Sequence, residues 1–351
     1  MRAASLTASN SEHERPRVPE ARSARRTALY AGRYVLTHCS GLIGLSVLIV
    51  LFWRLLPAGE WMTGTNFTVI LQEGTIFGVL ALAALIPIAS GLFDISFANV
   101  AGFASALMAW LGIHTALSDG WLFVMVIVAS MAFGATSGAI ISIFRLSSLF
   151  ITLAMASVAL AVTELILGGQ TLYPDIAAPG LHEFGPNLRA LGTGQWGPIP
   201  IAAAVLIILT VVLEVWLEHT PSGRRALATG SNQVAARLAG LKVARIQVFA
   251  LIAGSAIAGL AGIILITQNG TADDVTASGY LLPAIAALFL GTTQFRFRRN
   301  VAGTVLAVFL LQTGSHGLEL MGANVWVSYM FDGGILLLAV LLTRGGRLEP
   351  T

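Results

Sequence analysis

Long runs of apolar residues, separated by short polar stretches, dominate the chain from residue 36 onward. An α-helix needs roughly 20 apolar residues to cross a bilayer, because the hydrocarbon core has no water to pair with backbone groups. The pattern predicts about ten such helices. They cover residues 36–56, 67–90, 98–117, 121–144, 149–167, 199–217, 246–268, 280–292, 301–314 and 327–343. The eighth and ninth are short and contain glycine, which is typical of broken helices.

The composition supports the same fold class. Hydrophobic residues make up 56% of the 351 residues and charged residues only 11%, which is too little polar surface to cover a soluble globule of this length. We therefore expect an all-α, polytopic transmembrane bundle over residues 36–343. Glycine and alanine at Gly134/Gly138 and at Gly254/Ala258/Gly262 are spaced for close approach of helix backbones.

The distribution of arginine predicts the orientation, because cytoplasmic loops of membrane proteins retain Lys and Arg. With both termini in the cytoplasm, the basic N-terminal tail and nearly all basic loops fall on one side, and the opposite loops are acidic or neutral. Residues 1–35 are expected to form a disordered cytoplasmic tail, and residues 344–351 a short cytoplasmic C-terminal tail. The longest external loop, residues 168–198, is either a docking platform or an ordinary surface loop.

Several kinds of chemistry find little support. Cys39 is the single cysteine, which excludes an intramolecular disulfide and a thiolate cluster, and the six histidines lack the spacing of a zinc helix. The single lysine, Lys242, follows Leu241, so the chain has no Gly-Lys-Ser/Thr phosphate loop. We expect no catalytic residue, cofactor or metal on this chain and no nucleic-acid partner. Any energy from nucleotide hydrolysis would have to come from another subunit.

The most informative segment is the loop at residues 218–245, which is cationic between two apolar spans. Ser231 or Asn232 can cap a short helix over residues 233–239, and Gly240 can end it in a left-handed conformation. On that helix Val234 and Leu238, with Leu241 beyond it, lie near one stripe and form an apolar knob flanked by charge. The residues alone leave two interpretations open: a knob that enters a groove on a partner, or an interfacial helix resting on lipid headgroups.

The same segment has the pattern Gly-x-Asn-x-x-Ala-Ala-x-x-x-Gly, carried by Gly230, Asn232, Ala235, Ala236 and Gly240. In this it resembles the coupling loop of permeases of ATP-binding-cassette importers of the ribose and monosaccharide type, which are related to branched-chain permeases. Further similar stretches occur in the same order over residues 66–342, at residues 91–96 (GLFDIS), 253–264, 279–291, 301–304 and 336–342.

This resemblance implies a permease subunit in the bacterial inner membrane that forms the path for a monosaccharide or related polyol. Its implied partners are an ATPase subunit that carries ATP and Mg, a second permease, a periplasmic sugar-binding protein and the lipid bilayer. The implied ATPase-coupling residues are Gly230, Asn232, Gln233, Ala235, Ala236, Arg237 and Gly240. The chain departs from the family at Leu92 and Phe93 and at residues 292–300, so we hypothesise a diverged member of a heteromeric permease pair rather than a homodimer.

Polar residues inside the spans are the candidates for the translocation path, because a charge in the membrane is costly unless paired or hydrated. Gln72 and Glu73 lie well inside the second span and are expected to face a hydrated path. Asp94 either belongs to this path or caps the following helix. Glu164 and Asp332 lie nearer span ends, where they would reach interfacial water.

Two other classes of function are left open. In an ion-coupled secondary transporter, Glu73, Asp94 or Glu164 would carry a proton or sodium ion, although no cationic partner is evident within the spans. A membrane scaffold or receptor without transport is the third, but the short loops leave little exposed domain for signalling.

Overall fold

The computed structural model describes residues 40–56, 61, 63–174, 184–293 and 300–345. The predicted tail at residues 1–35 lies outside these ranges, as do residues 294–299 and 346–351. Within them the protein is an α-helical bundle with one small two-stranded antiparallel sheet. This confirms the predicted all-α class.

Seven described helices are long and apolar enough to cross a membrane, namely α3, α4, α5, α6, α8, α11 and α14, and three shorter apolar stretches lie in α2, α12–α13 and α15. These ten regions coincide in order with the ten predicted spans, and the protein is a multi-pass membrane protein. The helices are α2 (Ser40–Leu55), α3 (Gly64–Ala89), α4 (Phe97–His114), α5 (Asp119–Phe144), α6 (Ser148–Leu167), α7 (Pro186–Thr193), α8 (Ile201–His219), α9 (Pro221–Ser231), α10 (Gln233–Leu238), α11 (Val243–Asn269), α12 (Thr276–Gly279), α13 (Leu281–Thr293), α14 (Val301–Leu320) and α15 (Val325–Gly345). The two strands are β1 (Gln195–Trp196) and β2 (Ile199–Pro200).

The two short predicted spans have different outcomes. The eighth is not broken within its predicted residues 280–292, because α13 runs without interruption from Leu281 to Thr293; the break at Tyr280, between α12 and α13, lies at the start of this range. The prediction that the ninth ends at residue 314 is wrong, since α14 continues to Leu320. Its last two turns carry Ser315, His316 and Glu319, whose polarity ended the apolar pattern although His316 is buried inside the bundle.

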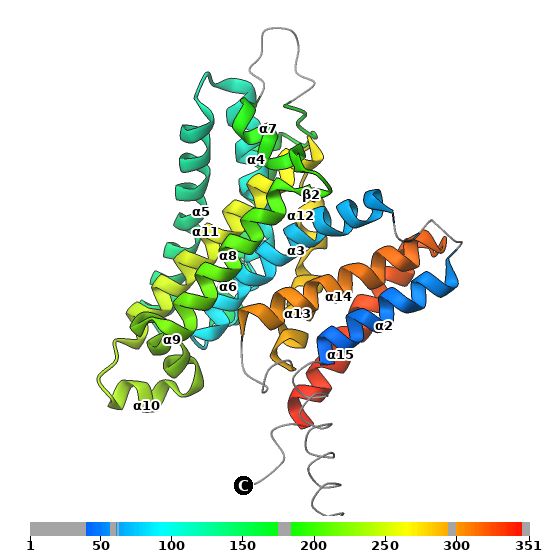
Figure 1. Cartoon of the computed structure of the whole chain (residues 1–351). Helices are drawn as coiled ribbons and strands as arrows, with labels where there is room; N and C mark the ends of the chain where they lie inside the picture. The colour runs from blue at the N-terminus through cyan, green and yellow to red at the C-terminus, as the bar shows by residue number, and fades with distance from the viewer. Residues whose placement is uncertain (1–39, 57–60, 62, 175–183, 294–299, 346–351) are drawn as a thin grey trace, which may run out of the picture.

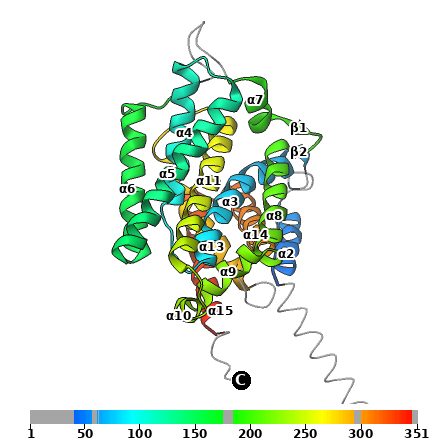
Figure 2. The same ribbon diagram turned by 90° about the vertical axis from the view of Figure 1, so that its left-hand side faces the viewer.

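Helices α3 and α11 form the centre of the bundle (Figures 1 and 2). Helix α3 packs against α8, α11, α13 and α14, and α11 packs against α3, α4 and α5. Nearly every residue of α3 from Gly74 to Ala89 is buried. Helices α5, α6 and α8 are peripheral, because only 28–33% of an 18-residue apolar stretch in each is buried. Their apolar outer faces suit contact with lipid.

Small residues allow the central helices to approach closely. A side-chain carbon on Gly254 of α11 would lie 2.8 Å from the carbonyl oxygen of Ala83 of α3, and one on Gly138 of α5 would lie 3.0 Å from Cα of Val248. At Gly134 it would collide with the carbonyl of Leu251. The predicted packing role of this stripe is confirmed, because these contacts are between backbones.

The bundle has two polar ends, which we call the α7 end and the α10 end. Figure 1 shows α7 at the top, and both α10 and the C-terminal end of α15 at the bottom. At the α7 end, both carboxylate oxygens of Asp119 accept hydrogen bonds from backbone N–H groups at the start of α7, from Gly185 (2.8 Å), Asn187 (3.1 Å) and Leu188 (3.3 Å). Part of the predicted external loop is thus anchored to α5, while its residues 175–183 lie outside the described ranges.

Candidate functional site

The predicted short helix at the α10 end is confirmed in its geometry. Helix α10 spans Gln233–Leu238, and Asn232 caps it by accepting the N–H groups of Val234 and Ala235, each at 3.0 Å. The other predicted cap, Ser231, instead donates to the carbonyl of Leu227. Gly240 has φ +81°, the left-handed conformation that ends a helix at little cost for glycine. Sequence reasoning missed helix α9, whose Thr220 cap and Pro221 are typical of a helix start.

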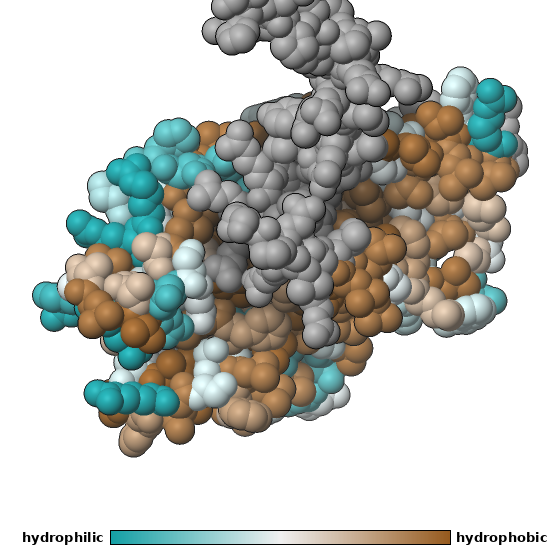
Figure 3. Space-filling view, turned by 90° about the horizontal axis from the view of Figure 1, so that it is seen from below, coloured by the Kyte–Doolittle hydropathy of each residue, from teal (hydrophilic) through white to brown (hydrophobic). Residues whose placement is uncertain are grey.

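The outer face of α10 is an exposed apolar knob. Val234 is 66% exposed and Leu238 is 85% exposed, while Leu241, the third predicted member, is half-buried. Arg237 and Lys242 are exposed beside this knob. Figure 3 views the molecule from this end and shows hydrophilic residues with apolar residues among them on the side of α9 and α10. Two large exposed apolar side chains on a six-residue helix indicate a surface that contacts a partner or lipid headgroups rather than a packed core.

The inner face of α10 is tied to the end of α3. The side-chain amide of Gln233 donates to the carbonyl of Gly91 at 3.2 Å. Gly91 has φ +81°, and a side-chain carbon there would lie 3.0 Å from Cα of Gly230. The two predicted motifs, residues 91–96 and the segment around α10, are therefore in direct contact although they are far apart in sequence.

The 91–96 segment is also fastened to α6. The backbone N–H of Phe93 donates to the Ser148 hydroxyl at 3.0 Å, and that of Ile95 to the Thr152 hydroxyl at 3.3 Å. The Thr152 hydroxyl in turn donates to the carbonyl of Phe93 at 3.3 Å. The 91–96 segment, which joins α3 to α4, therefore contacts α10 through Gln233 and α6 through Ser148 and Thr152.

Asp94 lies in this segment and is only 1% exposed. One of its oxygens accepts from the N–H (2.8 Å) and the hydroxyl (2.7 Å) of Ser96, the residue at the N-cap of α4. The prediction that Asp94 itself caps α4 is wrong. Its carboxylate accepts hydrogen bonds from Ser96, the N-cap residue, and not from the N–H groups of the first helical turn. Asp94 shapes the turn between α3 and α4.

A cavity of about 290 Å³ with a mixed polar and apolar lining lies between α3, α12, α13, α14 and α15. Sixteen residues line this cavity: Glu73, Phe77, Thr276, Gly279, Tyr280, Pro283, Ala287, Val308, Leu311, Gln312, Ser315, Glu319, Val325, Ser328, Tyr329 and Asp332. Glu73 precedes Ala89, the last residue of α3, by 16 positions, so about 24 Å of helix separates the cavity from the α10 end.

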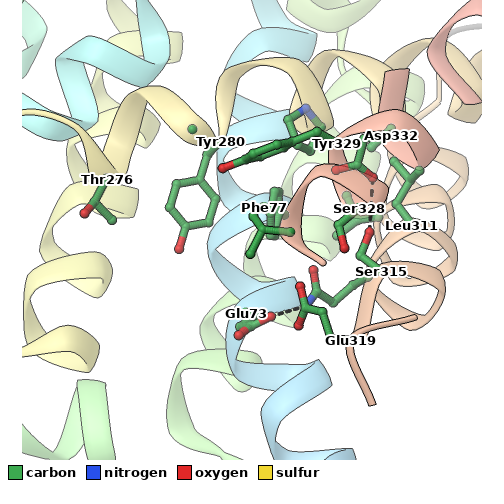
Figure 4. Close-up of a pocket in the computed structure, with 16 residues that line it drawn as sticks. Glu73, Phe77, Thr276, Tyr280, Leu311, Ser315, Glu319, Ser328, Tyr329 and Asp332 are labelled. Carbon is green, nitrogen blue, oxygen red and sulfur yellow. Dashed lines mark hydrogen bonds between the residues drawn. The ribbon is translucent and has the colours of Figure 1, made fainter. Parts of the chain in front are cut away.

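Two hydrogen bonds cross between the helices of this cavity (Figure 4). The Gln312 amide of α14 donates to the Glu73 carboxylate of α3, and the Ser315 hydroxyl of α14 donates to Asp332 of α15 at 3.3 Å. Phe77 and Tyr280 pack edge to face with ring centroids 4.6 Å apart. The cavity thus combines carboxyl groups, hydroxyls and aromatic faces on four helices.

The structure separates the predicted path residues. Glu73 lines the cavity, but Gln72 and Asp94 are not among the residues that line it. Adjacent helical residues point about 100° apart, which explains why Gln72 does not join Glu73. Glu319 and Asp332 were not predicted to belong here. The signal that could have found Glu319 is the polar spacing of i, i+3 and i+7 at Gln312, Ser315 and Glu319, which lies on one helical face.

Comparison with known proteins decides the family. Residues 66–340 match the family described as the permease component of the branched-chain amino acid transport system. This chain belongs to that family of transport permeases. The permease is 28% identical to the ribose import permease protein of Bacillus subtilis (strain 168), over 86% of this chain and 91% of the relative.

Two further relatives extend the comparison. The permease is 29% identical to the ribose import permease protein of Escherichia coli (strain K12), over 86% of this chain and 92% of the relative. It is 27% identical to an L-arabinose ABC transporter permease protein of Azospirillum brasilense, over 90% of each chain. Helix α10 and all the residues that line the cavity lie within residues 66–340, which match the family.

Proposed function

We propose that this permease forms the membrane path of an ATP-binding-cassette importer for a monosaccharide or related polyol, which a periplasmic binding protein delivers. The relatives named for ribose and L-arabinose support this solute class. ATP and Mg bind to a separate ATPase subunit, since this chain has no phosphate loop around its single lysine.

The observation that carries the proposal is the construction of α10. Its apolar pair, Val234 and Leu238, points into solvent, and both ends of the helix are closed by Asn232 and Gly240. Gln233 on the opposite side reaches Gly91. We assign α10 the role of coupling helix: its outer face enters a groove of the ATPase, and its inner face passes the motion to α3, α4 and α6.

The cavity supplies the solute-facing part of the same path. It lies in the half of α3 remote from α10, which is the outer half of the bundle if α10 faces the cytoplasm. A solute released by a binding protein at the α7 end would meet this half first. The two hydrogen bonds that join α14 to α3 and to α15 would have to rearrange as the helices move past one another.

Co-purification tests the assignment of α10. The tagged permease is extracted in mild detergent, and proteins that remain bound are identified by mass spectrometry. Leu238→Ala should lower the recovery of an ATPase subunit at least tenfold, because burial of a leucine side chain contributes roughly 1.5–3 kcal/mol. Leu165→Ala is the matched control, since Leu165 is 81% exposed on α6 and Leu238 is 85% exposed on α10.

The outcomes separate the alternatives. Recovery of an ATPase with the unaltered permease and with Leu165→Ala, but not with Leu238→Ala, supports coupling through α10. A homogeneous oligomer without any ATPase would favour an ion-coupled carrier instead. Recovery of one permease sequence or of two would decide between a homodimer and the heteromeric pair.

A further inference from the structure

The lining of the cavity has an unbalanced charge. Glu73, Glu319 and Asp332 contribute three carboxyl groups from α3, α14 and α15. Among the described residues that line it, none is a lysine, arginine or histidine. The side chains that donate hydrogen bonds to Glu73 and Asp332 among the described residues are neutral, an amide and a hydroxyl.

We infer that this cavity binds a small polyhydroxylated solute, prefers one that carries a protonated amine, and rejects the corresponding anion. The inference rests on the proposed function, because it assumes that the transported solute occupies this cavity. It adds the charge selectivity of the site, which neither the family nor the relatives specify.

The polar groups of the cavity are suited to hydroxyls. Each carboxylate has several acceptor positions, and the single bond from Gln312 to Glu73, or from Ser315 to Asp332, leaves others for a ligand. Ser328 gives an independent indication of a ligand. Its side chain is only 7% exposed, it lines the cavity, and its hydroxyl oxygen has no hydrogen-bond partner among the described residues. A buried hydroxyl without a partner is costly, and rotation of the Ser328 side chain toward a ligand hydroxyl would remove that cost.

The size and the apolar faces suit the same class of ligand. A cavity of about 290 Å³ is at the lower end of the roughly 300–1,000 Å³ of small-molecule sites, so it suits a solute of one ring rather than an oligosaccharide. Aromatic surface comes from Phe77 of α3, Tyr329 of α15 and Tyr280, which lies between α12 and α13. Aromatic faces also attract a nearby cation, which favours an ammonium group over a carboxylate.

The rejection of anions follows from electrostatics. An anion in this cavity would face three acidic groups without a compensating cation among the described lining residues, in surroundings where charges are weakly screened. An ammonium group would instead form charge-assisted hydrogen bonds with the same carboxylates. Neutral sugars should fall between the two, because their hydroxyls donate without adding charge.

Three probes that share one pyranose ring isolate the effect of charge: D-glucosamine, D-glucose and D-glucuronate. Their dissociation constants are measured by saturation-transfer NMR at neutral pH, on the full-length permease in lipid nanodiscs with the subunits that copurify. We expect glucosamine to bind best and glucuronate at least tenfold more weakly than glucosamine. Empty nanodiscs correct for binding to lipid.

Two variants locate the effect. Asp332→Asn should reduce the glucosamine-to-glucuronate ratio at least threefold, whereas the exposed Glu218→Gln on α8 should leave it unchanged. The ratio is measured within one preparation, so a lower yield of folded variant does not alter it. Equal binding of the three probes, binding of none, or an unchanged ratio in Asp332→Asn would overturn the inference.

Parallel co-purification keeps this inference distinct from the proposed function. If an ATPase is recovered but the charge order is absent, the cavity assignment fails and the importer assignment stands. If the charge order is present but no ATPase is recovered, the cavity assignment stands and the importer assignment fails.

Discussion

Removal of the N-cap of α10 gives a quantitative test of the proposed role of α10 as a coupling helix. Asn232→Ala deletes the side-chain oxygen that accepts the N–H groups of Val234 and Ala235 at 3.0 Å. Asn232 is exposed and its backbone is extended, with φ −156° and ψ 101°, a conformation that alanine also adopts. The substitution therefore removes hydrogen bonds without strain or a buried cavity.

The magnitude follows from the isolation of α10. Replacement of an asparagine cap by alanine costs about 1 kcal/mol of helix stability, which is roughly a fivefold change in an equilibrium constant. Only Ala236 of the six residues in α10 is buried, so tertiary contacts do little to offset the loss. We expect the ratio of unfolded to folded α10 to rise about fivefold and ATP-driven uptake to fall in proportion to the folded fraction that is lost.

Hydrogen–deuterium exchange on peptides that cover residues 230–242 measures the first effect, and uptake into proteoliposomes the second. Asn232→Ser should restore most of the protection, because serine is also a good cap. Ser231→Ala is the neighbouring control, since the Ser231 hydroxyl bonds to Leu227 and takes no part in the cap. Unchanged exchange in Asn232→Ala, or an equal increase in Ser231→Ala, would refute the reasoning.

Three further predictions concern single contacts. Gly134→Ala should destabilise the permease by about 1–3 kcal/mol in detergent unfolding, because the added carbon meets the backbone of α11, whereas Gly120→Ala in open space should not. Gln233→Glu replaces the donor to Gly91 by an acceptor and should lower uptake severalfold while ATP hydrolysis continues; a proportional fall of both would contradict the link. Gly240→Ala puts a side chain at φ +81°, costs about 1–2 kcal/mol, and should weaken ATPase co-purification by at least fivefold; normal recovery would count against the coupling role.

Local patterns predicted the elements well. The cap and stop of α10 were evident because Asn232 and Gly240 act on backbone groups within a few residues. The end of α14 was misjudged because hydropathy treats a polar residue as leaving the membrane, while His316, beyond the predicted end, remains buried within the bundle. Asp94 was assigned to two roles by its position, and only its contact with Ser96 distinguished a turn-forming role from a cavity lining.

By itself, the sequence determined the membrane environment, the order of the apolar spans and the form of α10, since apolar run length and helix-end chemistry are local properties. Only the tertiary structure decided which distant groups meet. Gln233 reaches Gly91, and Glu73 shares a cavity with Asp332, through packing around α3 that no local pattern encodes. The physical reason is that the rotation of each helix about its axis, which selects the side chains that face one another, is set by interhelical contacts.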